Sequence, residues 1–160
     1  MKKIQKTNVA RLLDKAKVAY ELIAYEVDEN DLAAQHVADS LGEDIRQVFK
    51  TIVLHGDKTG HLVCVLPGDC EVDLKKAARV SGNKKVEPLP LKELLPTTGY
   101  IRGGCSPIGM KKQFPTVLSD SARDLPTVIV SGGRIGFQVE LEPNALLKLI
   151  RGQFGDIEVK

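Results

Sequence analysis

The sequence predicts an α+β fold in which a curved sheet of mixed strand direction is flanked by helices. Segments whose apolar residues alternate with polar ones, as in β-strands, are interspersed with segments whose apolar residues recur every three or four positions, as in helices. These segments do not follow the strict strand–helix–strand order of a parallel sheet. No repeat, low-complexity stretch or linker divides the 160 residues, so we expect a single domain over residues 1–160.

The first part of the chain predicts two helices separated by a strand. Residues 9–16 place apolar side chains at helical spacing, and Thr7 or Asn8 can cap this helix. Residues 20–27 alternate and predict a strand. Residues 31–41 return to helical spacing and stop at a glycine, which predicts a second helix.

A hairpin is expected next. Asp44 can cap a short turn that leads into a strand at 49–55, which is rich in β-formers. The turn 56–60 begins and ends with glycine, and it joins this strand to a second one at 62–66.

Helices and a long loop follow the hairpin. Asp73 can cap a helix at Leu74–Ser81, which a glycine closes, and residues 90–95 predict a short helix that Pro96 should end. Residues 97–109 hold four glycines and a proline, so we expect a loop there.

The C-terminal part predicts three more strands and a helix. The strands are expected at 115–118, 127–131 and 136–141. Pro143 suits the first turn of the last helix, and Gly152 is expected to end that helix.

Composition excludes several classes of protein. Hydrophobic residues make up 42% and charged residues 28%, which is ordinary for a globular chain and excludes intrinsic disorder. The longest apolar runs have four or five residues, whereas a membrane-spanning helix needs about 20. The basic first residues lead into an amphipathic helix without the apolar stretch of a signal peptide, so we expect a cytoplasmic protein.

Cysteine and histidine do not form a metal-binding or disulfide pattern. The three cysteines are dispersed without a C-x-x-C pair, and the three histidines lie outside known ligand spacings. We therefore expect neither a metal nor a disulfide framework. The residues concerned are Cys64, Cys70, Cys105, His36, His55 and His61.

Charge is distributed unevenly along the chain. Residues 26–44 contain seven acids and no lysine or arginine, whereas residues 75–112 contain nine bases and two acids, which is a local charge of +7. This asymmetry suggests a polyanionic partner for the basic half. Lysines on an ordinary solvated surface are an equally good explanation.

Lys50 is the first candidate for chemistry. Strand alternation places it on one face with Ile52 and Leu54, where an ammonium is costly to bury unless an anion meets it. Lys50 could therefore bind a phosphate or a developing oxyanion at the mouth of a pocket. Alternatively, the lysine extends its ammonium into solvent from the start of the strand.

The glycine-rich segment 97–109 is the second candidate. Glycines let the main chain approach a ligand and direct successive N–H groups at it. The spacing matches neither a P-loop nor a dinucleotide fingerprint, so the segment could also be a plain structural loop.

Three further residues have both a functional and a structural interpretation. Cys105 lies in this loop, but no histidine is placed as its base, so a nucleophilic role is disfavoured. Ser131 could bind a ligand where a strand ends or could simply begin a turn. Tyr25 could point into the concave side of the sheet or could simply pack there.

The order and separation of five motifs resemble the YbaK/EbsC branch of the prolyl-tRNA editing family, and the resemblance covers nearly the whole chain. The motifs are Phe49-Lys50-Thr51, Asp73-Leu74-Lys75-Lys76-Ala77-Ala78, Thr98-Gly99-Tyr100, the run from Gly103-Gly104-Cys105-Ser106-Pro107 to Lys112, and Val130-Ser131-Gly132-Gly133.

This resemblance implies a barrel-like sheet and a free-standing enzyme that removes cysteine from tRNA specific for proline and from tRNA specific for cysteine. It implies no cofactor, no metal and no enzyme nucleophile, because the substrate's thiol attacks its own ester carbonyl and leaves as a cyclic thiolactone. The implied partners are the acceptor end of an aminoacyl-tRNA and prolyl-tRNA synthetase.

The resemblance also implies roles for individual residues. Lys50 matches the lysine that fixes the terminal adenosine and its phosphate, and Tyr25 and Ser131 match positions that line the pocket. The loop that would contact the aminoacyl carbonyl consists of Gly103, Gly104, Cys105, Ser106 and Pro107. The candidates for contact with tRNA phosphates are Lys75, Lys76, Arg102, Lys111 and Lys112.

Some positions depart from the family pattern around the pocket. Cys105 replaces an aliphatic residue, Gln138 replaces an acid found in some relatives, and Ala24 and Val27 replace histidines beside Tyr25. A small difference in an apolar pocket changes discrimination by only about 1–3 kcal/mol. Two alternatives therefore remain: a deacylase that uses water to remove alanine or another small amino acid, and a non-catalytic module that binds tRNA or a synthetase.

Overall fold

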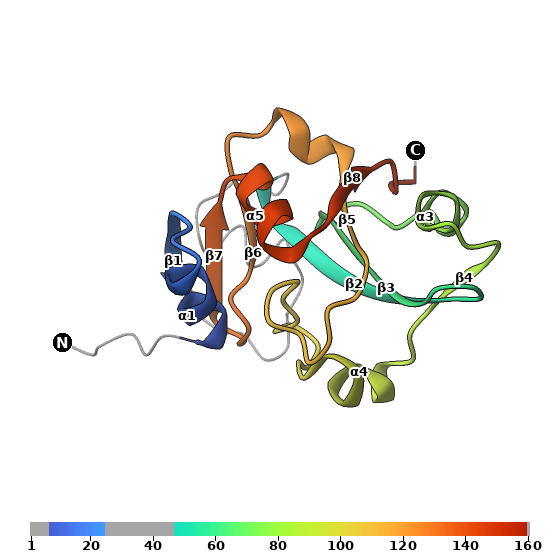
Figure 1. Cartoon of the computed structure of the whole chain (residues 1–160), viewed down its shortest axis with the longest axis horizontal. Helices are drawn as coiled ribbons and strands as arrows, with labels where there is room; N and C mark the ends of the chain where they lie inside the picture. The colour runs from blue at the N-terminus through green and yellow to red at the C-terminus, as the bar shows by residue number, and fades with distance from the viewer. Residues whose placement is uncertain (1–6, 25–46, 160) are drawn as a thin grey trace.

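Two β-sheets lie side by side at the centre of the fold in the computed structural model, which describes residues 7–24 and 47–159 (Figure 1). One sheet has three antiparallel strands in the order β1 (Tyr20–Ala24), β7 (Phe137–Leu141) and β6 (Val128–Ser131). The other has five strands in the order β4 (Val86–Pro88), β2 (Phe49–Gly56), β3 (Gly60–Pro67), β5 (Thr116–Ser119) and β8 (Gln153–Gly155). Because β3, β5 and β8 run parallel while β4, β2 and β3 run antiparallel, the predicted α+β fold with a mixed sheet is confirmed.

The two sheets meet at a bridge beside the start of β2. Val48 forms a parallel bridge with Ile129 of β6. The described strands form two sheets, not one closed barrel, because β4 pairs only with residues 54–56 of β2 and the chain then leaves the sheet.

The β2–β3 hairpin is confirmed, and its two faces are buried in different clusters. Its register runs from Phe49 opposite Pro67 to Gly56 opposite Gly60. Phe49 and Val53 belong to a cluster with the strands of the smaller sheet, whereas Leu54, on the other face, packs with residues of the helix after β3. The alternation of side chains along a strand thus builds both parts of the core.

Asn83 holds the hairpin turn. Its side-chain oxygen accepts hydrogen bonds from the main-chain N–H groups of Lys58 and Thr59, both at 2.9 Å. A Cβ atom at Gly56 would lie 2.4 Å from the Asn83 amide nitrogen, so only glycine leaves room for this contact.

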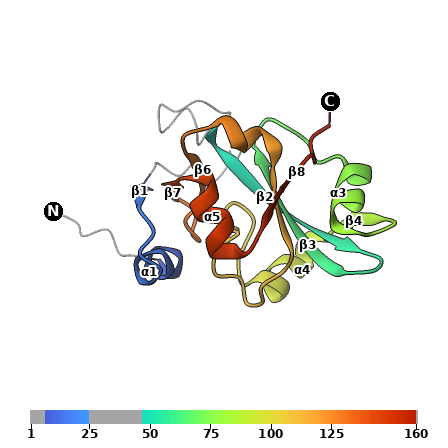
Figure 2. The same cartoon turned by 45° about the horizontal axis from the view of Figure 1, so that its top comes forward.

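Two helices form as the sequence predicts. In α1 (Asn8–Lys15) the Thr7 side chain accepts a hydrogen bond from the N–H of Ala10 at 3.3 Å. In α3 (Leu74–Ser81) Asp73 accepts from Lys76 N at 3.1 Å, and Gly82 ends the helix in the left-handed conformation. Figure 2 shows α3 beside β4 and α1 at the opposite end of the molecule.

The ends of the other two helices differ from the prediction. Pro96 does not end α4 (Leu91–Thr98), since the Thr98 hydroxyl donates to the Leu94 carbonyl at 2.8 Å and the helix continues to Gly99. The last helix, α5 (Pro143–Ile150), ends at Arg151, which adopts a left-handed φ of 53°.

Several short elements have no clear sequence signal. The three-residue strands β4 and β8 are too short for alternation to reveal, and the 3-10 helix η2 (Asp120–Asp124) was also not predicted. The predicted helix at 31–41, the end of the strand at 20–27 and the turn starting at Asp44 lie outside the described residues.

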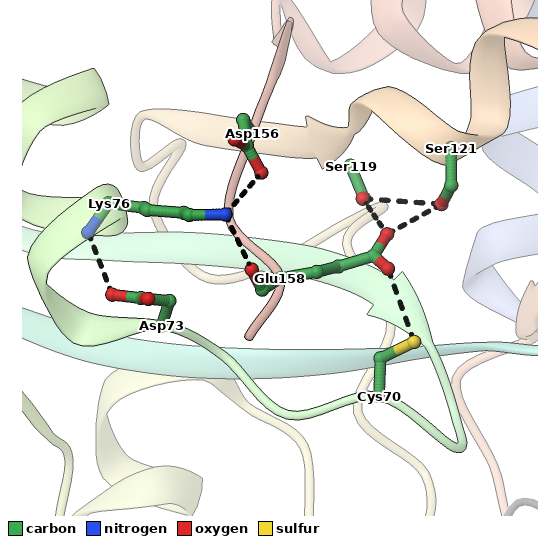
Figure 3. Close-up of polar contacts among 7 residues, drawn as sticks. All are labelled: Cys70, Asp73, Lys76, Ser119, Ser121, Asp156 and Glu158. Carbon is green, nitrogen blue, oxygen red and sulfur yellow. Dashed lines mark hydrogen bonds and ion pairs between the residues drawn. The ribbon is translucent and has the colours of Figure 1, made fainter. Parts of the chain in front are cut away.

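A cluster of hydrogen bonds attaches the C-terminal segment to the rest of the fold (Figure 3). The Glu158 carboxylate accepts from the Ser119 hydroxyl, from the Ser121 hydroxyl at 2.6 Å and from the Cys70 thiol at 3.2 Å. The Lys76 ammonium donates to Asp156 at 3.1 Å and to the Glu158 carbonyl at 2.9 Å.

All three cysteines are free thiols. Among the described helices, none combines the length and the apolar character needed to cross a lipid bilayer.

Replacement of Glu158 should reduce stability in a pH-dependent way. Burial opposes ionisation, but hydrogen bonds from Ser119, Ser121 and Cys70 outweigh it and lower the pKa of Glu158 below its ordinary value of 4.5. A lowered pKa stabilises the fold fully above the unfolded-state value, and this contribution is lost as the pH falls through the folded-state value. We expect Glu158→Gln to cost about 1 kcal/mol at neutral pH.

The measurement is urea unfolding from pH 7 to pH 3, with the exposed Glu71→Gln as control. The difference between wild type and Glu158→Gln should shrink as the solution becomes acidic. A difference that stays constant across this range would contradict a role for the ionised carboxylate.

Thr51→Val should stabilise the free protein. The Thr51 hydroxyl oxygen is the one buried side-chain nitrogen or oxygen without a hydrogen-bond partner in residues 7–24 and 47–159. An unpaired buried polar group costs about 1–3 kcal/mol, and valine keeps the shape without that group. We therefore expect a gain of about 1 kcal/mol in the free energy of unfolding.

The matched control is Thr116→Val, because the Thr116 hydroxyl donates to the Phe114 carbonyl at 3.0 Å. This control should lose stability where Thr51→Val gains it. Equal destabilisation of both variants in denaturant unfolding would show that the Thr51 hydroxyl has a partner in solution.

Candidate functional site

A cavity of about 560 Å³ lies along the first half of β2. Residues 48–53 form one wall, and residues from the β4–α4 connection, the glycine-rich loop and the smaller sheet form the others. The other residues that line it are Gly68, Pro88, Leu89, Leu91, Leu94, Arg102, Gly103, Cys105, Ser131 and Gln138.

The cavity exists because β4 leaves the edge of β2 early. The Leu89 N–H donates to the Val53 carbonyl at 3.1 Å, which is the last main-chain link on this side. Pro90 has no N–H and starts the turn into α4, so the chain cannot extend the ladder. The main-chain groups of successive strand residues point to alternate edges, so those of Thr51 point to the same edge as those of Val53.

Lys50 is half-buried in the cavity wall. Its ammonium donates to the Gly68 carbonyl at 3.4 Å, and the Gly68 N–H in turn donates to the Val48 carbonyl at 2.9 Å. In the part of the chain that the structure describes, no carboxylate lies within 4.0 Å of this ammonium. Among the described residues this positive charge thus has no acidic partner, which suits it to bind an anionic group of a ligand.

The glycine-rich loop contributes only some of its predicted residues to this cavity. Gly103, whose φ is +87°, and Cys105 line it. Gly104 packs against the main chain of residues 134 and 135, and the Ser106 hydroxyl accepts from the Ile108 N–H at 3.2 Å. Pro107 lines a separate cavity of about 220 Å³.

The Cys105 thiol lacks the properties of a nucleophile. Burial raises its pKa to about 11, against a smaller opposing effect from a hydrogen bond with Thr98. A thiol with this pKa stays protonated at neutral pH. His55 and His61 lie opposite each other at the far end of the hairpin and do not line the cavity.

Ser131 and Gln138 lie opposite each other on β6 and β7, and both are buried in the cavity wall. The Ser131 hydroxyl accepts from the Gly133 N–H at 3.2 Å. The Gln138 carboxamide forms no hydrogen bond with any other described residue. Tyr25 lies outside the described residues.

The predicted phosphate-binding residues do not gather in one place. Arg102 lines the cavity, and Lys111 and Lys112 are exposed on the same loop. Lys75 and Lys76 lie on α3, where the Lys76 ammonium already pairs with Asp156. In the cavity lining Lys50 and Arg102 are the charged side chains, and both are cations.

Sequence reasoning missed part of the lining. Leu91 and Leu94 of α4 line the cavity, and Leu94 packs against the core cluster that contains Phe49 and Val53. Gly68, whose carbonyl accepts from Lys50, also lines it. The proline after Leu89 was a signal that β4 stops there. No three His, Cys, Asp or Glu side chains within residues 7–24 and 47–159 are grouped as metal ligands.

Comparison with known proteins gives consistent matches. The model of the aminoacyl-tRNA editing domain family matches residues 28–149. EbsC of Enterococcus faecalis, provisionally named a Cys-tRNA(Pro)/Cys-tRNA(Cys) deacylase, is 54% identical over 156 residues, which are 98% of this chain and 95% of that protein.

Two further matches concern prolyl-tRNA synthetase. The proline–tRNA ligase of Fervidobacterium nodosum is 29% identical over 82 residues, which are 51% of this chain and 14% of the ligase. A crystal structure described provisionally as a trans-editing enzyme for prolyl-tRNA synthetase has the same fold, with a TM-score of 0.81 and 23% identity over 98% of this chain and all of that one.

The family model covers most of the chain and the EbsC match covers nearly all of it. Both agree with the resemblance that the motifs indicate. The chain therefore belongs to the aminoacyl-tRNA editing domain family, and its activity is aminoacyl-tRNA deacylation.

Proposed function

We propose that this protein removes cysteine from tRNA specific for proline, and from tRNA specific for cysteine, by positioning the substrate for attack by its own thiol. The observation that supports this most directly is the Lys50 ammonium, which has no carboxylate partner among the described residues and shares an otherwise uncharged cavity lining with Arg102. A cavity of about 560 Å³ accommodates a terminal adenosine with a small aminoacyl group. The close similarity to EbsC supports cysteine as that group.

The proposed reaction uses atoms of the substrate alone. The cysteine sulfur attacks its own ester carbonyl carbon, a carbon–sulfur bond forms and the carbon–oxygen ester bond breaks. The thiol proton ends on the ribose oxygen that leaves, which frees the tRNA. The cyclic thiolactone is then hydrolysed to cysteine in water. The protein contributes orientation and stabilisation of the developing charge.

In this proposal, Lys50 binds the phosphate of the terminal adenosine. The main chain at Gly103 contacts the aminoacyl carbonyl, as its left-handed conformation lets the loop approach closely. Cys105, Ser131 and Gln138 form a neutral wall around the amino acid side chain. Burial, which raises the pKa of the Cys105 thiol, supports the view that this residue is not a nucleophile.

Alanyl-tRNA specific for proline is a second candidate substrate. The neutral wall formed by Cys105, Ser131 and Gln138 contains nothing that requires a thiol on the substrate. Alanine cannot cyclise, so this reaction would need water as the nucleophile and would release free alanine directly. Detection of a thiolactone distinguishes the two reactions.

We further propose that the chain acts as one domain over residues 1–160, in trans, beside prolyl-tRNA synthetase. The similarity of 82 residues to a proline–tRNA ligase supports a functional connection with that enzyme. Co-purification of the two full-length proteins in the presence of tRNA is a direct test.

Lys50→Ala should reduce deacylation of cysteinyl-tRNA specific for proline by about 10²-fold, because the ammonium would no longer orient the substrate phosphate. The measurement is a time course of radiolabelled cysteine release from that tRNA, with alanyl-tRNA as the second substrate. Lys84→Ala, an exposed lysine remote from the cavity, is the matched control. Wild-type activity in Lys50→Ala would rule out this site.

Cys105→Ala should still form the thiolactone from cysteinyl-tRNA, because the sulfur that reacts belongs to the substrate. Any effect should fall on KM, since the variant changes the shape of the cavity wall. The thiolactone is identified directly by mass spectrometry, because a nucleophilic trap such as hydroxylamine would form the same product from the unreacted ester. Loss of the chemical step in a single-turnover experiment, with tRNA binding intact, would identify Cys105 as a participant.

A further inference from the structure

The exposed apolar side chains of the described chain gather beside the cavity. Of five large apolar residues with substantial exposure, three lie on α4 and in the loop after it: Leu91 (61%), Leu95 (51%) and Ile101 (52%). Leu91 and Leu95 are four residues apart and share one helical face. Leu94 and Thr98 on the other face pack inward. The helix lies at the edge of the molecule (Figure 1), and its face with Leu91 and Leu95 is exposed to solvent.

Cations border this apolar surface. Arg102 directly follows Ile101, and the Lys111 side chain crosses the end of α4, where its ammonium lies 3.5 Å from the Pro96 carbonyl. Residues 91–112 contain four lysines and arginines and one acid, a local charge of +3. We call Leu91, Leu95, Ile101, Arg102 and Lys111 the α4 ledge.

The ledge is continuous with the mouth of the cavity. Leu91 and Arg102 belong to both, and Leu94 joins them from the buried side of α4. A ligand whose terminal group fills the cavity would place the atoms next to that group against this border. For an aminoacyl-tRNA, those atoms belong to the unpaired nucleotides that precede the terminal adenosine.

We propose that the α4 ledge binds these unpaired nucleotides of the tRNA 3′ end, an inference that rests on the proposed function. Single-stranded RNA presents flat apolar bases alternating with phosphates, and it binds surfaces that combine apolar side chains with cations. Leu95 and Ile101 contact the bases, and Arg102 and Lys111 contact the phosphates. The excess of positive charge favours this polyanion over an apolar protein surface as the occupant.

The test compares two substrates of different length. Cysteinyl-tRNA reaches the ledge, whereas the minimal ester cysteinyl-adenosine ends within the cavity. The variant Leu95→Ser with Ile101→Ser changes two exposed residues that do not line the cavity. It should raise KM for cysteinyl-tRNA about tenfold with kcat unchanged, and it should leave the minimal ester unaffected. Leu74→Ser, an exposed leucine on α3, is the matched control.

A second variant tests the charge. Lys111→Gln should reduce the slope of log affinity against log salt by about one for a short RNA oligonucleotide ending in CCA. Direct binding of this oligonucleotide, measured for all variants, does not depend on catalysis. The binding measurement therefore tests the ledge even if the wild-type protein deacylates neither substrate. Absence of deacylation would contradict the proposed function but not the ledge.

Three results would overturn the ledge proposal. Equal effects of the double variant on both substrates would show that the ledge shapes the cavity. Unchanged tRNA kinetics and unchanged oligonucleotide binding in both variants would show that the ledge does not contact RNA, and loss of synthetase binding alone would identify a protein-docking surface. Unchanged unfolding midpoints for each variant verify that the fold is retained.

Discussion

The incomplete pairing of β2 is the constraint on which the site depends. One edge of this strand is bonded to β3 along its whole length, whereas β4 covers the other edge only at residues 54–56. The hydrogen bond from Leu89 to Val53 is the last link, and Pro90 then directs the chain into α4. A strand that is rigid on one side and open on the other provides a fixed wall for the cavity.

The burial of both faces of the hairpin makes this wall rigid. Val63 and Val65 pack against the smaller sheet, while Leu62, Cys64 and Leu66 pack against the residues of α3. Lys50 lies opposite Leu66 of β3, whose residues 62–67 are buried. Because a buried strand resists local opening, the position of Lys50 is well defined. Among the described residues its ammonium is bonded to a carbonyl, at Gly68, and to no carboxylate. The hairpin thus holds a cation at the cavity wall without an acidic partner in the described part of the chain.

Some residues of the glycine-rich loop stabilise the fold, whereas others line the cavity. Its outer residues are secured by local bonds, such as the one from Tyr100 to the Ile108 carbonyl at 2.6 Å. Gly103 and Cys105 remain at the cavity. Because α4 continues past Pro96, the loop begins only at Gly99. The earlier part of the same helix lines the cavity through Leu91 and Leu94.

The sequence by itself determined the strands of the hairpin, the cap of α3 and the family, because local patterning and ordered motifs are encoded by neighbouring residues. It left the cap of α1 open between Thr7 and Asn8, and the structure shows Thr7. It also singled out Lys50, whose role stays a prediction. It could not assign β4 and β8, which are three residues long and exist only through their partners. Nor could it show that Gly103 and Arg102 line the cavity whereas Ser106 and Lys76 do not. Only the tertiary structure decided these, because the place of a loop residue or a surface lysine depends on which distant segments pack around it.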